Sequence, residues 1–173
     1  MSNQEKILRS IELLKEIGYR TDSICAIKHL PAQEGQYREY PDGVHPALRE
    51  ALGQKGFHRL YSHQRSCWDA LREKKNVVVV TPTASGKTLC YNLPVLDAIL
   101  KDPSSRALYL FPTKALSNDQ RAELDDTNAR LPEEIRVFTY DGDTPQDARK
   151  AIRARGHIVL TNPDMLHVPA VLL

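Results

Sequence analysis

The sequence lacks the features of a membrane or secreted protein. None of its apolar runs approaches the roughly 18–20 residues needed to cross a bilayer, and its first residues, MSNQEK, lack the apolar core of a secretory signal peptide. Cys25, Cys67 and Cys90 are too far apart for a C-x-x-C pair, and three is an odd number for a disulfide framework. No H-E-x-x-H motif is present. We therefore expect a reducing, cytoplasmic setting and no structural zinc site.

The chain also lacks a strong charge of either sign. Its 173 residues carry a formal net charge of +2, with 41% hydrophobic and 27% charged residues, which is typical of a soluble globular chain. This length fits one domain, or one domain with an N-terminal extension. Because the net charge is small, any binding to a polyanion must depend on locally placed donors rather than on bulk charge.

The first 55 residues are predicted to form a helical extension and a linker, and residues 56–173 the main domain. Apolar residues recur at three- and four-residue spacing from Ile7 to Ile17, which predicts an amphipathic helix over 4–17 that stops at Gly18. The pattern is lost over 21–43, which we interpret as a linker or a loop wrapped over the core. Two further helices are predicted, at 45–55 and at 62–74, the second with Ser62 as its N-cap.

Beyond residue 76, short apolar segments alternate with helical ones. Strands are predicted at 77–80, 107–111, 135–140 and 157–161, and helices at 87–101, 114–126 and from the cap Thr144 to about 155. The first of these strands is four consecutive valines, as expected for a strand buried on both faces of a parallel sheet. The alternation predicts an α/β domain with a doubly wound, mainly parallel sheet.

The most specific motif is TPTASGKT at 81–88, between the first predicted strand and the next helix. Small residues let backbone N–H groups turn toward phosphate oxygens, and the helix N-terminus adds a positive dipole end. Lys87 is expected to reach the β- and γ-phosphates, and the Thr88 hydroxyl to ligate Mg²⁺. Thr81 and Ala84 stand where such loops often have glycine, so we expect negative φ angles at both. The predicted nucleotide-binding residues of the loop are Thr83, Ala84, Ser85, Gly86, Lys87 and Thr88.

Four ordered segments resemble motifs of the superfamily 2 DEAD/DEAH-box helicases. Residues 81–96 resemble the Walker A region, in the Ala-Ser-Gly-Lys form typical of the RecQ-related branch with the MrfA/YprA and Hrq types. LYSHQ at 60–64 resembles the Q motif, FPTKAL at 111–116 motif Ia, and TNPDMLH at 161–167 motif Ib. YDGDT at 140–144 is similar to a loop that this branch carries. The resemblance covers about residues 57–168 and implies an incomplete RecA-like P-loop NTPase domain.

The resemblance implies that the nucleotide is ATP with Mg²⁺ and that Lys87 is catalytic. Gln64 would contact adenine, since its amide offers a donor and an acceptor that suit the N6/N7 edge. The alternative is a glutamine at a helix N-terminus that makes a local bond. Tyr61 is expected either to pack on the base or to face the core.

The resemblance also implies a nucleic-acid site at the ends of two predicted strands. Thr113 and Lys114 follow the second strand, and Thr161 and Asn162 lie at the end of the fourth. Ligands of open α/β sheets bind at the carboxyl ends of the β-strands. These residues are therefore expected to contact successive phosphates of one nucleic-acid strand. Each alone is more typical of a cap or turn.

Charged residues near this site have simpler interpretations. We interpret the basic face of the last predicted helix as solvated, with its cations favoured by the helix dipole; it comprises Arg149, Lys150, Arg153 and Arg155. Asp141 and Asp143, on either side of Gly142, indicate a turn, because two carboxylates alone are weak evidence for a metal site.

The sequence contains no Asp-Glu dipeptide, the pair that the resemblance implies for motif II. In the family, the strand that ends in motif II lies beside the phosphate-loop strand, so the absence of the motif II strand is expected to expose strand edges. We interpret the chain as the N-terminal part of an ATP-dependent DNA helicase. DNA repair and 3′-to-5′ movement are implied by the branch, and a second RecA-like domain is expected as partner. One alternative is a truncated, noncatalytic nucleotide- or nucleic-acid-binding module. Another is a P-loop kinase or small NTPase, which leaves the 111–116 and 161–164 segments unexplained.

Overall fold

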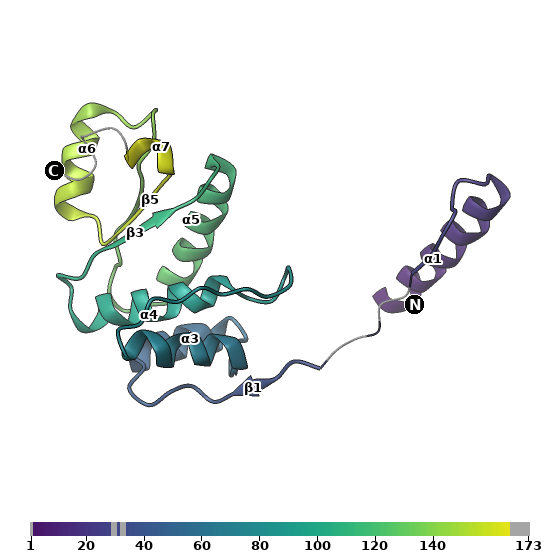
Figure 1. Cartoon of the computed structure of the whole chain (residues 1–173), viewed down its shortest axis with the longest axis horizontal. Helices are drawn as coiled ribbons and strands as arrows, with labels where there is room; N and C mark the ends of the chain where they lie inside the picture. The colour runs from purple at the N-terminus through teal and green to yellow at the C-terminus, as the bar shows by residue number, and fades with distance from the viewer. Residues whose placement is uncertain (1, 29–30, 32–33, 167–173) are drawn as a thin grey trace. The chain divides into compact units, whose positions relative to one another are not determined.

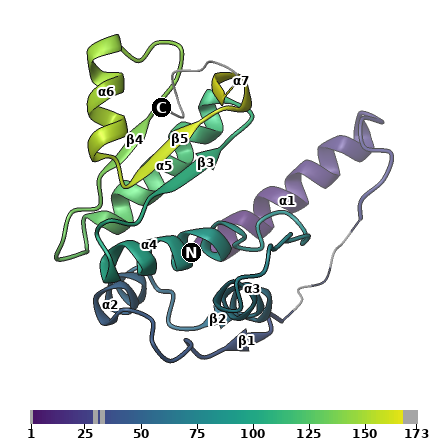
Figure 2. The same ribbon diagram turned by 60° about the vertical axis from the view of Figure 1, so that its left-hand side comes forward.

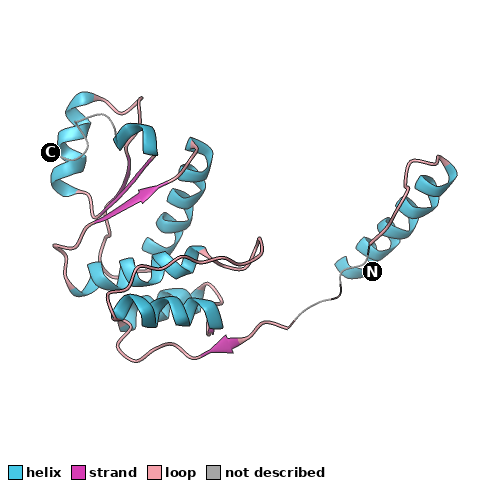
Figure 3. Cartoon of the chain, in the orientation of Figure 1, coloured by secondary structure: helices cyan, strands magenta, loops and turns pink. Residues whose placement is uncertain are grey.

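The chain divides into two compact units, Met1–Glu34 and Gly35–Leu173 (Figure 1). The computed structural model describes residues 2–28, 31 and 34–166. Figure 3 colours the helices and strands of both units by type. The second unit contains all the predicted site residues, and it begins at Gly35, earlier than the boundary at 55/56 predicted from the sequence.

The first unit is built on the helix α1, Asn3–Arg20. A capping box begins it: the Glu5 N–H donates to Ser2 Oγ at 3.2 Å, and the Ser2 N–H donates to Glu5 Oε2 at 2.7 Å. The expected stop at Gly18 is wrong, because the helix continues for two more residues. Gly18 serves packing instead: a Cβ there would lie 2.1 Å from Ile24 Cδ1, so only glycine lets the returning chain approach.

The second unit opens with a short ribbon and two helices. Strands β1 (Tyr37–Arg38) and β2 (Leu60–Tyr61) pair antiparallel, and the helices are α2 (Pro46–Gln54) and α3 (Ser62–Arg72). Ser62 is the first residue of α3 rather than its N-cap, which is Tyr61. Leu48 and Leu52 of α2 are buried in the core, so residues 46–54 pack with the main domain and not as part of an extension.

A parallel three-stranded sheet forms the second half of this unit. Its strands are β3 (Ala107–Leu110), β4 (Val137–Thr139) and β5 (Ile158–Thr161), in the order β3-β5-β4. The helices are α4 (Thr88–Lys101), α5 (Lys114–Asn128), α6 (Gln146–Arg155) and the short α7 (Pro163–Leu166). Helices α5 and α6 lie on opposite sides of the strands in both views (Figures 1 and 2). The α/β architecture with a parallel sheet is thus confirmed.

The strand predicted at 77–80 is wrong. This segment forms no ladder with any described residue. Its side chains alternate: Val77 and Val79 are half-buried, whereas Val78 and Val80 are each 88% exposed. The valine run has the propensity for a strand, but a strand also needs a hydrogen-bonded neighbour, and the described part of the chain supplies none.

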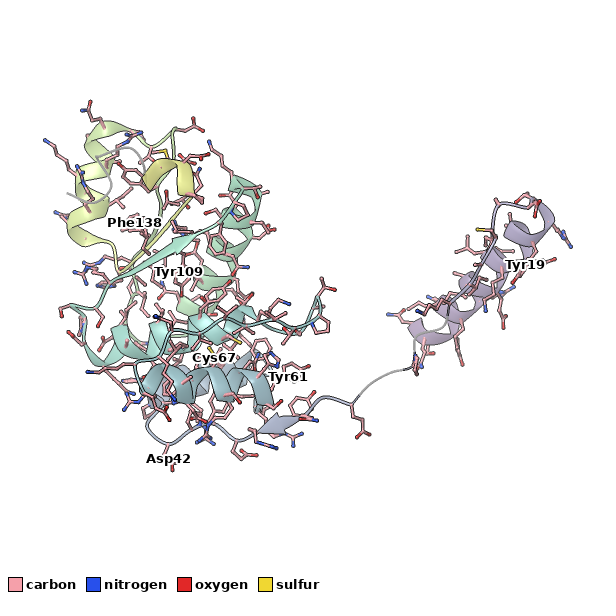
Figure 4. The ribbon with its side chains drawn as sticks, in the orientation of Figure 1. Tyr19, Asp42, Tyr61, Cys67, Tyr109 and Phe138 are labelled. Atoms are coloured by element: carbon pink, nitrogen blue, oxygen red, sulfur yellow. The ribbon has the colours of Figure 1, made fainter. Side chains whose placement is uncertain are left out.

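The core lies between the sheet and the helices and fixes the sheet register. Ile158 and Leu160 of the central strand are fully buried, and Ile158 pairs with both Ala107 and Val137. Tyr109 projects from β3 toward α4 (Figure 4), where its hydroxyl donates to Asn92 Oδ1 at 2.9 Å. Because the strands are parallel and in register, their carboxyl ends meet at one edge of the sheet.

Candidate functional site

The loop at 81–87 closes around the ammonium group of Lys87. Lys87 Nζ donates to the carbonyls of Thr81 at 2.9 Å and Pro82 at 2.6 Å, and lies 3.4 Å from Ser85 Oγ. The hydroxyls of Thr81 and Ser85 are 2.6 Å apart. The one basic side chain of residues 81–87 is therefore held by backbone oxygens, at the N-terminus of α4, where the helix dipole favours an anion.

The backbone of this loop departs from the sequence prediction at Ala84. Its φ is +58°, whereas we expected a negative angle. Gly86, two residues on, has φ +72°. A tight loop that turns back on its own lysine needs left-handed residues, and alanine accepts this conformation at a cost of about 1–2 kcal/mol. Thr81 is not one of the described residues with a positive φ, as we expected.

Gln64 connects the start of α3 to the phosphate loop. Its Oε1 accepts the Tyr61 N–H at 2.8 Å, and its Nε2 donates to the Gly86 carbonyl at 2.8 Å. The side chain is only 5% exposed. The local bond at a helix N-terminus, which the sequence left open as an alternative, is thus present. Contact between Gln64 and adenine stays a prediction, and it requires the amide to exchange at least one of these partners.

A cavity of about 460 Å³ opens beside the loop, lined by Gln64, Gly86 and Thr88 among others. Tyr61 stands in its wall (Figure 4), stacked on Tyr37 with ring centroids 5.0 Å apart. The Arg59 guanidinium lies 4.8 Å from the centre of the Tyr37 ring. Sequence reasoning missed Tyr37 and Arg59, because Tyr37 falls in the stretch interpreted as a linker and only the β1–β2 pairing brings it to Tyr61.

The four residues predicted to contact nucleic acid lie together at one edge of the sheet. Thr113, Lys114, Thr161 and Asn162 line one small hollow. Two of them also act as caps: Thr113 Oγ1 accepts the Leu116 N–H at 3.3 Å, and Asn162 Oδ1 accepts the Met165 N–H at 3.0 Å. Thr161 is only 2% exposed, and its hydroxyl has no hydrogen-bond partner among the described residues.

Lys114 is not a free cation. Its ammonium is hydrogen-bonded to Asp143 and lies 3.5 Å from Asp141 Oδ2. The hydrogen bond that Lys114 donates to Asp143 raises the pKa of Lys114 and lowers the pKa of Asp143. The sequence indicated only a turn at these aspartates and gave no sign that they face Lys114, which is 29 residues before Asp143.

Helix α6 contributes less to this edge than its charge suggests. Arg149 is half-buried, its Nε donates to the Thr144 carbonyl at 2.9 Å, and its guanidinium lies 5.3 Å from the centre of the Tyr140 ring. Thr144 is not the N-cap of α6, as the sequence suggested; that residue is Pro145. The Thr144 hydroxyl instead accepts the Asp141 N–H at 2.9 Å.

A parallel α/β sheet with a Gly-Lys-Thr loop leading into a helix defines this unit as a P-loop nucleotide-binding domain. The chain belongs to the DEAD/DEAH box helicase family, whose model matches residues 61–170. It is 50% identical over 135 residues to the ATP-dependent helicase YprA of Bacillus subtilis, covering 78% of this chain and 18% of YprA. It is 36% identical over 163 residues to the ATP-dependent helicase HRQ1 of Saccharomyces cerevisiae. This match covers 93% of this chain and 15% of HRQ1.

Among solved structures, the chain resembles the DUF1998 helicase MrfA bound to DNA and AMPPNP. The TM-score is 0.77 at 48% identity, over 81% of this chain and 20% of MrfA. The predicted RecA-like fold is therefore confirmed. The chain spans a fifth or less of the length of these relatives.

Proposed function

We propose that this chain is the ATP-binding, N-terminal part of the motor of an ATP-dependent DNA helicase. The observation that carries the proposal is the loop of Lys87 and Thr88 at the start of α4, in a chain of the DEAD/DEAH box helicase family. Two relatives are named as ATP-dependent helicases, and the MrfA structure is bound to DNA. A second RecA-like domain, 3′-to-5′ movement and a role in DNA repair belong to the same proposal.

In the proposed nucleotide complex, Lys87 leaves the carbonyls of Thr81 and Pro82 and turns to the β- and γ-phosphates. The loop from Thr83 to Gly86 then presents its N–H groups to the phosphate oxygens. The base enters the cavity beside Gln64, whose volume exceeds that of a purine. This assignment gives Lys87 two roles: it closes the loop through the carbonyls of Thr81 and Pro82, and it binds the β- and γ-phosphates of the nucleotide.

The Mg²⁺ that accompanies ATP fits the donors at the loop only in part. Across residues 2–28, 31 and 34–166, no group of three or more His, Cys, Asp or Glu side chains is placed to hold a metal. The Thr88 hydroxyl would supply one ligand, and the triphosphate and water the others. When bound, the ion neutralises charge on the phosphates.

At the sheet edge, we propose that Thr113, Lys114, Thr161 and Asn162 contact the phosphates of a single DNA strand. The first-turn N–H groups of α5 support the proposal, since a helix N-terminus favours anions. Contacts of this kind position the strand and carry no base sequence. DNA rather than RNA is proposed from the relatives alone.

One observation favours binding without turnover for these 173 residues by themselves. They hold no Asp-Glu pair, and efficient hydrolysis needs a carboxylate that orients the attacking water. We therefore propose that the isolated chain binds ATP and nucleic acid, while hydrolysis requires further parts of a longer protein. The intact mass of the native polypeptide separates the two possibilities: a mass several-fold above 19.6 kDa supports a full motor, and a mass near 19.6 kDa supports the noncatalytic module.

The decisive activity test is ATP hydrolysis by the native protein with and without single-stranded DNA. We expect hydrolysis that DNA stimulates and that Lys87→Ala abolishes. Lys15→Ala, which removes an exposed lysine of the first unit, is the matched control and is expected to match the wild type. Hydrolysis that persists in Lys87→Ala contradicts the assignment of the loop, and hydrolysis that ignores DNA contradicts the motor.

We propose a cytoplasmic location, which the two buried free cysteines of the second unit support. None of the helices in the described part of the chain has the length and apolar character of a membrane span. Cys67 and Cys90 are buried and unbridged, with Cys67 Sγ donating to the Cys90 carbonyl at 3.3 Å. Burial raises the pKa of the Cys90 thiol to about 11, so it stays a thiol at neutral pH. A reducing compartment suits this pair.

A further inference from the structure

We propose that the loop at 140–144 competes with nucleic acid for Lys114. Its carboxylates, chiefly Asp143, hold the Lys114 ammonium, and a phosphate of the nucleic-acid backbone must displace them to bind. The inference rests on the proposed nucleic-acid site. It assigns Asp143 a role that the sequence did not indicate, as an internal substitute for phosphate that weakens binding.

The loop is built to deliver these carboxylates. Asp141 Oδ1 accepts the Asp143 N–H at 3.0 Å and the Thr144 hydroxyl at 3.2 Å. This Asx turn leaves Asp141 Oδ2 facing Lys114. Arg149 fixes the far end through its bond to the Thr144 carbonyl. Asp143 is thus presented by an ordered turn rather than by a loose loop.

The contact lies where a phosphate is expected. Lys114 and Asp141 line the same hollow as Thr113, Thr161 and Asn162. The carboxylates and an incoming phosphate are both anions that need the same ammonium donor, so they cannot both hold it in the same geometry. The raised pKa of Lys114 and the lowered pKa of Asp143 agree with a formed pair.

The pair is weak enough to be displaced. The Lys114 side chain is 52% exposed and the Asp143 side chain 84%, and exposed pairs contribute little because water and salt screen them. Losing Asp143 is therefore expected to tighten binding of single-stranded nucleic acid by about two- to fivefold. The Asp143 contact thus sets a threshold for binding. The site favours a nucleic-acid strand that also contacts Thr113 and Asn162 over an isolated phosphate.

The test measures binding of a fluorescein-labelled oligodeoxythymidylate to the full 173-residue chain by fluorescence anisotropy. The variants are Asp143→Asn, Lys114→Gln and the double variant. Asp119→Asn is the matched control, because it removes the same charge from an exposed position of α5. Asp141 is left intact because it builds the turn. Circular dichroism verifies that each variant is folded.

We expect Asp143→Asn to lower Kd by two- to fivefold, Asp119→Asn to leave it nearly unchanged, and Asp143→Asn to have no effect when Lys114 is already glutamine. Equal effects of Asp143→Asn and Asp119→Asn on Kd, or an effect of Asp143→Asn that survives in the double variant, overturn the inference. Either result would mean that removing any negative charge strengthens binding through the general electrostatic field of the protein. Binding by the wild type that Lys114→Gln does not weaken overturns it as well, since Lys114 is then no phosphate ligand. No binding by any variant at low salt refutes the proposed nucleic-acid site itself, and the inference with it.

Discussion

Replacing Lys87 with alanine tests the nucleotide site with a magnitude that the structure supplies. Lys87 donates two hydrogen bonds to the carbonyls of Thr81 and Pro82, at 2.9 and 2.6 Å. Each joins a charged donor to a neutral acceptor and is worth about 1.5 kcal/mol net, whereas a bond from the same ammonium to a phosphate anion lies near about 3 kcal/mol. Exchanging two of the former for two of the latter favours the nucleotide by about 3 kcal/mol. Losing this gain is expected to weaken ATP binding about 150-fold.

The assay is a titration of the chain with a fluorescent ATP analogue in the presence of Mg²⁺. Lys15→Ala serves as the control and is expected to bind like the wild type. A second readout needs no nucleotide: amide hydrogen exchange over 81–86 should quicken in Lys87→Ala, because the lysine no longer ties the loop to itself. A Kd for Lys87→Ala within twofold of the wild-type value would refute the reasoning, whatever the exchange data show.

Three further predictions concern stability. Burial and the charge of Arg136 lower the pKa of His157. The unfolded chain therefore takes up a proton first as pH falls through about 6.5, and the folded state loses stability below that pH. Urea titrations at pH 7.5 and 5.5 should show that His157→Gln loses less stability between the two pH values than the wild type, and an equal loss refutes the role of His157. Leu160→Ala should lower the free energy of unfolding by about 2–5 kcal/mol, since Leu160 is fully buried, whereas Leu13→Ala, at a position 56% exposed, should change it by under about 0.5 kcal/mol. Ala84→Gly should stabilise the chain by about 0.5 kcal/mol in the same titration, because relief of the left-handed alanine exceeds the added chain entropy; a loss of stability contradicts this.

Local patterns were sufficient for most helices and for three of the strands. The spacing of apolar residues and the caps depends on neighbours a few positions away, so helices such as α4 and α5 follow the predicted ranges closely. The Gly-Lys-Thr signal at the start of α4 is local in the same sense. Conditions met only in three dimensions explain the errors. Val77–Val80 needed a paired neighbour, and the conformation of Ala84 is set by closure of the whole loop.

The positions of the candidate-site residues in the fold were predictable, whereas their partners within the protein were not. Thr113 and Asn162 were identified from strand ends, and the parallel register brings them together. Their contacts within the protein were out of reach, because no periodic pattern connects Lys114 to Asp143 or Tyr37 to Tyr61. Such pairs arise from turns and ribbons whose geometry sequence spacing does not encode.

The strand order has a consequence for synthesis. β5 lies between β3 and β4, yet it is the last of the three to leave the ribosome. At about 5–20 residues per second, the interval between the end of β4 and the end of β5 is roughly 1–4 s. During that interval the two earlier strands have no partner in the sheet, and the edge that gathers Thr113, Lys114 and Asn162 does not exist. The nascent chain therefore completes residues 81–88 well before it can form the edge that we propose contacts nucleic acid.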